Sequence, residues 1–191
     1  MSRRMAGLLA IAIVAIAATW LLFVALPRWR QREPDRQPSN QPGAVAERKI
    51  TATLYFVSED GMSLVGVQRE VPFGETVLDQ ARHILDAQMG AAPAPLASAI
   101  PAGTAVHALY ITERGDAFVD LSADARTKHT GGALDELFTV YTIVDVLTVN
   151  LPAIARVQIL IEGKEVDTLA GHVDLRHPLQ KNLGWIRQKV E

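Results

Sequence analysis

The chain contains no cysteine among its 191 residues. It therefore cannot form a disulfide, use a thiol nucleophile, bind zinc or an iron–sulfur cluster through thiolates, or carry a lipid on an N-terminal cysteine. A chain without thiols suits a reducing and an oxidising compartment equally well, so this absence leaves the location of the protein open.

Two common catalytic signatures are missing as well. No Gly-x-Ser-x-Gly elbow surrounds Ser122, and the run Ser122-Ala123-Asp124 is more typical of a helix or turn cap. Gly131-Gly132 is not followed by the Lys-Ser or Lys-Thr of a phosphate-binding loop, which favours a flexible entry into a helix. These absences predict a protein that is not an enzyme and has no cofactor.

The five histidines offer one weak candidate for a metal site. His172, Asp174 and His177 lie close in sequence, but the spacing His-x-Asp-x-x-His matches no zinc signature. The neighbouring Gly171 and Pro178 suit a loop that crosses the domain surface. Two other histidines are expected on a helix surface and in a strand, respectively: His83 and His107.

Acidic residues gather around one expected hairpin, at Glu113, Asp116, Asp120 and Asp124. Their spacing is not that of a known calcium loop, which favours a solvated edge over a calcium site. Arg114-Gly115-Asp116 also spells a cell-adhesion tripeptide, but a turn between two strands requires residues of this kind in any case.

Charge divides the chain into two parts. Residues 1–48 hold 7 Lys+Arg and 3 Asp+Glu, a net charge of +4, whereas residues 49–191 hold 12 and 18, a net charge of −6. Because the larger part is acidic, we expect no nucleic acid among its partners.

The most prominent feature that is present is an uncharged apolar run over residues 6–26. As a helix it would span about 30 Å, the thickness of the hydrocarbon core of a bilayer. Arg3-Arg4 and Ala15-Ile16-Ala17 also fit a cleaved signal peptide, but the apolar run continues past that point. A twin-arginine signal matches poorly, because Met5-Ala6-Gly7 follows the arginines. We predict an uncleaved transmembrane anchor over residues 1–27, which contacts membrane lipid through residues 6–26.

Residues 28–48 predict an extended, Pro-rich linker, because they contain Pro34, Pro38 and Pro42 and almost no residue able to enter a core. Arginines flank the anchor on both sides, so the positive-inside rule does not decide its orientation. The remaining residues 49–179 are enough for one domain with its own core.

The first half of this domain predicts a hairpin and a helix. Apolar residues alternate over residues 50–57 and again over residues 65–71, with turn residues between them, which is typical of two antiparallel strands. Thr76 and Asp79 are spaced as a capping box that begins a helix ending near Met89. The Pro-rich loop over residues 90–104 is long enough to carry recognition.

The second half predicts strands at 105–111, 116–121 and 157–161 and a long helix that Pro152 ends. The first of these strands is apolar on both faces and is expected to be central. We expect Glu136 and Asp145 on or near the flanks of the helix. The fold class is α+β: a two-layer sandwich with a mainly antiparallel sheet, two helices packed on one face, and the order ββαββαβ after the transmembrane helix.

The C-terminal tail, residues 180–191, has apolar residues near one helical face, with Gly184 weakening the helix. An amphipathic tail docked on the domain or on a partner and a frayed end are both open interpretations.

Four segments in order resemble the GerMN domain of sporulation and spore germination proteins, over residues 49–179. They are "ITATLYFVSEDGMSLVGVQREV", "IPAGTAVHALYITERGDAFVDLS", "GGALDELFTVYTIVDVLTVNLPAIARVQILIEGK" and "GHVDLRHPL". The resemblance implies an extracytoplasmic module, tethered by a lipid or a helix, that is not a catalyst. It also implies that the short N-terminus lies in the cytoplasm. The chain departs from spore-forming members in its single copy and membrane helix, and in having Tyr141 and Asp145 where relatives tend to carry Gln and Asn.

We therefore expect a single-pass protein of the cell membrane with an extracytoplasmic C-terminal domain that acts as an interaction or scaffold module. Its expected partners are envelope or membrane proteins, with self-association as a further expectation. A cell-wall or small-ligand binding module, or a weak hydrolase, is the alternative; it would use the loop at 90–104 and the segment from His172 to His177. A third interpretation is an anchored stabilising subunit of a transporter.

Overall fold

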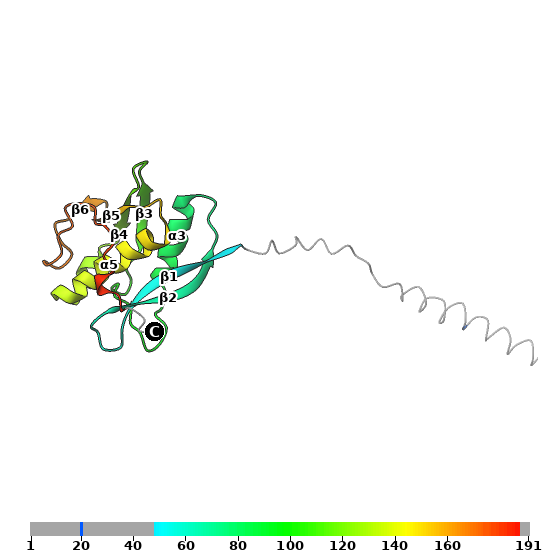
Figure 1. Cartoon of the computed structure of the whole chain (residues 1–191), viewed down its shortest axis with the longest axis horizontal. Coiled ribbons are helices and arrows are strands. Elements are labelled where there is room, and N and C mark those ends of the chain that lie inside the picture. The colour runs from blue at the N-terminus through cyan, green and yellow to red at the C-terminus, as the bar shows by residue number, and fades with distance from the viewer. Residues whose placement is uncertain (1–19, 21–47, 188–191) are drawn as a thin grey trace, which may run out of the picture. The chain divides into compact units, whose positions relative to one another are not determined.

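The computed structural model describes Trp20 and residues 48–187 (Figure 1). The predicted anchor, apart from Trp20, and the predicted linker, apart from Arg48, lie outside the described residues, as does the tail after Arg187. Within the described residues, no helix has both the length and the apolar character needed to cross a membrane.

The predicted first hairpin is confirmed. Strands β1, Lys49–Val57, and β2, Leu64–Pro72, pair antiparallel along their whole length, from Lys49 opposite Pro72 to Val57 opposite Leu64. They form a two-stranded sheet of their own. Helix α3, Val77–Gln88, follows, and the predicted capping box is present: Thr76 Oγ1 accepts from Asp79 N while the Asp79 carboxylate accepts from Thr76 N.

The second sheet has four strands in the order β3-β4-β5-β6: Val106–Ile111, Asp116–Leu121, Arg156–Ile161 and Lys164–Glu165. β3 is an edge strand, so the expectation of a central strand is wrong; only Leu109 of this strand is buried. β4 and β5 pair parallel, because the chain crosses between them through α4, Asp124–Thr127, and α5, Ala133–Asn150.

The expectation of one sheet with both helices on one face is therefore wrong. There are two sheets, and α3 and α5 pack against each other while each contacts both of them (Figure 1). The expected order of seven elements is interrupted by the short α4 and extended by β6 and the 3-10 turn η2, Leu183–Trp185. The α+β class and the mainly antiparallel pairing are confirmed.

Helix α5 runs through the interior of the domain. From Phe138 to Thr148 every residue except Tyr141 is buried, and the apolar side chains pack into the main core. Glu136 and Asp145 lie on the buried side of this helix and not on solvated flanks: both are 0% exposed, which corrects the expected placement.

The end of the described chain crosses the domain as a mostly extended segment, residues 179–187, which we call the C-terminal strap. Leu179 exchanges two main-chain hydrogen bonds of 2.8 Å with Val157 of β5. Ile186 forms a parallel bridge with Leu64 of β2, and Arg187 N donates to Leu64 O at 2.8 Å. The described part of the tail is thus docked on both sheets, without the long helix that its spacing favoured.

Candidate functional site

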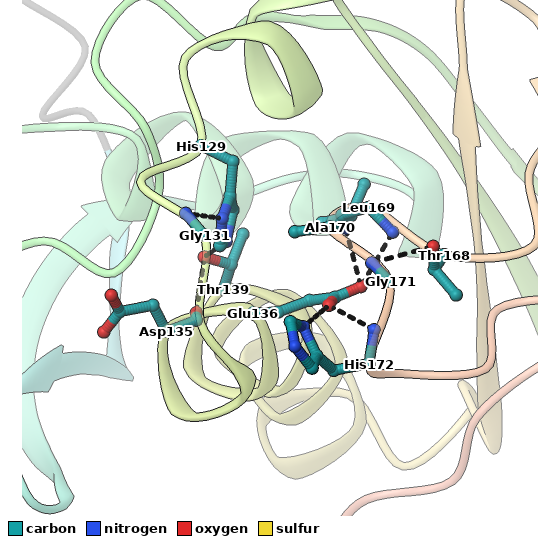
Figure 2. Close-up of polar contacts among 10 residues, drawn as sticks. All are labelled: His129, Gly131, Asp135, Glu136, Thr139, Thr168, Leu169, Ala170, Gly171 and His172. Carbon is teal, nitrogen blue, oxygen red and sulfur yellow. Dashed lines mark hydrogen bonds and ion pairs between the residues drawn. The ribbon is translucent and has the colours of Figure 1, made fainter.

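The buried carboxylate of Glu136, in the first turn of α5, is the centre of a polar cluster with four hydrogen-bond contacts (Figure 2). Its Oε1 accepts from Leu169 N at 2.8 Å and from Ala170 N at 2.9 Å. Its Oε2 accepts from His172 N at 2.7 Å and lies 3.0 Å from His172 Nδ1. One side chain therefore fixes the loop that follows β6 onto the start of the helix.

Physical chemistry favours an ionised carboxylate at this place. Burial by itself raises the pKa of Glu136, but hydrogen bonds from the main chain of Ala170 and His172 and from the His172 ring outweigh it, so the pKa lies below the ordinary value of 4.5. The N-terminal end of a helix adds further stabilisation to a negative charge. With four donors on its two oxygens, Glu136 has little capacity left to act on a substrate.

The group His172, Asp174 and His177, which lies close in sequence, is divided between different partners. His172 turns its ring to Glu136, whereas Asp174 binds Arg176 through three hydrogen bonds that hold the pKa of this carboxyl well below its usual range. In the part of the chain that the structure describes, no group of three or more His, Asp or Glu side chains is arranged to hold a metal ion.

A second polar link joins the Pro-rich loop to α5. Gly131 N donates to His129 Nδ1 at 3.0 Å, so the proton of a neutral ring lies on Nε2, which is 3.2 Å from Thr139 Oγ1. The Thr139 hydroxyl in turn lies 2.6 Å from Ala99 O (Figure 2 shows the helix end of this link). Gly131, with a φ of 84°, gives the left-handed turn that brings the chain into the helix.

Three residues of this link, Ala99, His129 and Thr139, line a hollow of about 570 Å³. Loop residues 97–102 form one wall and Phe138 with Thr139 of α5 another, while Lys128, His129 and Asp135 contribute polar groups. The loop predicted to carry recognition thus lines a hollow, but His172 and His177 do not line it.

Asp145 is the second buried carboxylate of α5. Its Oδ1 accepts from Asn182 N of the strap at 2.9 Å, whereas its Oδ2 has no hydrogen-bond partner among the described residues. Burial raises the pKa of Asp145 to about 6, against smaller lowering effects of the Asn182 hydrogen bond and of Lys181. Burial and the nearby Asp145 charge raise the pKa of Tyr55 to about 12.

The other candidates have structural partners. The Ser122 hydroxyl accepts from Ala105 N at 3.0 Å and does not cap α4. The acidic residues near the second hairpin are engaged separately: Asp116 with Arg156, Asp120 with Gly163 N, and Asp124 with Lys128. Since Asp116 is tied to Arg156 within the fold, the Arg-Gly-Asp tripeptide is used in a turn, as expected.

Comparisons with known proteins add the following. The family described as "Germane: Sporulation and spore germination" matches residues 53–167. No match is found among curated proteins.

Three solved structures share the fold. They are a Clostridium perfringens protein described as a lipoprotein (24% identity, TM-score 0.51, 70% of this chain and 88% of that one), the first GerMN domain of GerM from Bacillus subtilis (22%, 0.52, 70% and 96%), and the tandem GerMN domains of the same protein (20%, 0.52, 71% and 46%).

Proposed function

Because the chain belongs to the Germane family of sporulation and spore germination proteins, we propose that its folded part is an extracytoplasmic interaction module that takes part in assembling an envelope or sporulation complex. The family match over residues 53–167 is the observation that carries this proposal. The similar Clostridium perfringens protein is described as a lipoprotein, which supports a membrane-held, outward-facing domain.

The placement of the ionisable groups supports a binding role over catalysis. Glu136 and Asp145 have no exposed surface, and Glu136 uses both oxygens to hold a loop. An acid–base catalyst has to reach the proton that it transfers, and a carboxylate in this position does not. We therefore propose that the module has no enzymatic activity.

The proposed arrangement in the cell is a single membrane helix over residues 6–26, a Pro-rich linker, and a folded domain outside the membrane. Protease treatment of spheroplasts tests it. The expected result is cleavage of the chain from Lys49 onwards without lysis, whereas protection until lysis would place the domain inside.

Chemical cross-linking in intact membranes tests the interaction role. The expected result is a discrete product that contains this chain and an envelope protein. Recovery of the uncross-linked monomer alone, under conditions that cross-link a known envelope complex, would contradict the proposal.

The hollow beside loop 97–102 supports a second candidate, a small-ligand or cell-wall binding module. Its volume of about 570 Å³ is in the range of small-molecule sites, and Lys128 and Asp135 offer exposed polar groups. Calorimetry with cell-wall glycan fragments tests this candidate; saturable heat that is lost in Lys128→Met supports it, and no heat at millimolar ligand rejects it.

A further inference from the structure

The outer edge of β2 presents main-chain groups that face away from β1. The register pairs Tyr55 with Gly66 and Thr53 with Gln68. Since Tyr55 and Thr53 direct their N–H and C=O groups away from β2, those of Gly66 and Gln68 face the opposite side. In the chain from Arg48 to Arg187, the structure shows no hydrogen-bond partner for the main chain of Gly66, Gln68 or Glu70, and all three residues are exposed.

One position of this edge is already occupied by the C-terminal strap. Ile186 lies parallel to β2 at Leu64, Arg187 N donates to Leu64 O, and the Arg187 guanidinium pairs with Asp60. The strap therefore shows what this edge accepts: an extended segment, parallel to β2, with an apolar residue followed by a basic one.

The strap is docked at its two ends, by Leu179 on β5 and by Ile186 and Arg187 on β2, and is more open between them. Leu183 and Trp185 are 41% and 37% exposed. Between the two sheets the strap is bonded to Asp145, whose second oxygen is buried without a hydrogen-bond partner in the part of the chain that the structure describes. The charged and titratable groups that face Asp145 are Lys181 of the strap and Tyr55 of β1.

We propose that the edge of β2 from Leu64 to Glu70 binds an extended segment of a partner protein, which replaces the strap at Leu64 and continues as a third strand past Gly66 and Gln68. The segment carries an apolar residue at the Leu64 position and a basic residue that reaches Asp60. Main-chain hydrogen bonds provide affinity in this mode of binding, and alternate side chains provide specificity. The inference rests on the proposed function, to which it adds the kind of partner.

The test uses the full chain and a synthetic peptide with the sequence of residues 179–191, LQKNLGWIRQKVE. Amide hydrogen exchange at Gly66 and Gln68 is followed by NMR as the peptide is added. The expected result is fast exchange in the free chain and at least about tenfold slower exchange at saturation, because each amide gains a hydrogen bond. Gln68→Pro removes one donor from this edge without touching the β1–β2 ladder and abolishes binding, whereas Gln68→Ala keeps it.

Three outcomes overturn the proposal. The first is unchanged exchange at saturating peptide. The second is slow exchange in the free chain at every protein concentration, which would assign the edge to residues that follow Arg187. The third is slowing that rises with protein concentration alone, which would assign it to a second copy. These measurements use purified protein and are independent of the cross-linking test in membranes. If the peptide binds but no cross-link forms in membranes, the proposed function is rejected while this edge remains a binding site.

Discussion

The side-chain amide of Gln88, the last residue of α3, hydrogen-bonds to both main-chain groups of Tyr55, as a neighbouring strand would. Its Oε1 accepts from Tyr55 N at 2.8 Å and its Nε2 donates to Tyr55 O at 2.7 Å. Asn150, at the end of α5, makes the same pair of contacts with Thr53, at 2.8 Å each. The two helices therefore provide hydrogen-bond partners for the β1 edge at Tyr55 and Thr53, and the hairpin remains a separate sheet.

Replacing Gln88 by Met is expected to destabilise the domain by about 2 to 4 kcal/mol, because two buried main-chain groups of Tyr55 lose their partners while the volume is kept. Urea unfolding measures the change. Gln180→Met, at an exposed position of the tail, is the matched control and is expected to change stability by about 0.5 kcal/mol at most. Equal stability of the two variants would show that the Gln88 amide is dispensable.

Glu136→Gln is expected to cost about 2 to 4 kcal/mol at pH 7, because an amide nitrogen would face donors that now point at a carboxylate oxygen. The folded pKa of Glu136 is lowered, so its contribution is present above the usual value of 4.5 and is lost as the pH falls through the folded pKa. The loss of stability between pH 7 and pH 3 should therefore be smaller in Glu136→Gln than in the wild type. Glu165→Gln, exposed in β6, serves as control and should follow the wild-type curve.

Asp145→Asn is expected to have the opposite pH profile. The folded pKa of Asp145 is raised to about 6, so its favourable contribution is complete below 3.8 and is lost as the pH rises through 6. The Asn side chain keeps an acceptor for Asn182 N without a buried charge. The stability of the variant relative to the wild type should therefore be higher at pH 7.5 than at pH 5, by about 1 to 2 kcal/mol. Denaturation midpoints at the two pH values check this, and an equal effect at both would contradict it.

Gly115→Ala should be costly, because Gly115 has a φ of 81° and an added Cβ would lie 2.6 Å from Ala153 O. The expected loss is about 2 kcal/mol or more. Gly163→Ala is the matched control, with a φ of 72° and no atom within 4 Å of the added Cβ, and should lose about 1 kcal/mol. Comparing the melting temperatures of the two variants separates the cost of the clash with Ala153 O from the cost of a positive φ at alanine. The same decrease in melting temperature in both variants would show that the clash at position 115 is relieved without loss of stability.

Local patterns in the sequence predicted local structure well. The capping box at Thr76 and Asp79, the alternation in β1 and β2 and the stop at Pro152 each depend on residues a few positions apart, and each is confirmed. The family and the α+β class also followed from the sequence.

The arrangement of the sheets and the polar clusters could not be predicted in the same way. The helical spacing predicted solvent-exposed flanks for Glu136 and Asp145. The main-chain groups that donate to Glu136 lie 33 to 36 residues away, in a loop without a recognisable sequence pattern, so its burial could not be predicted. The amides of Gln88 and Asn150 likewise look like ordinary helix-end residues until β1 is placed beside them. The parallel pairing of β4 and β5 could have been predicted from the sequence, because a helix between two strands indicates a crossover connection.

Photo-cross-linking in intact membranes tests the central claim, that the folded part is an extracytoplasmic interaction module. A photoreactive residue is placed in turn at four exposed positions around the domain: Gln68, Tyr110, Lys128 and Glu165. We predict that at least one position gives a discrete product with an envelope protein, with Gln68 the strongest and Glu165 a low background. If irradiation gives no cross-linked product at any of the four positions and only the monomer is recovered, the claim is contradicted.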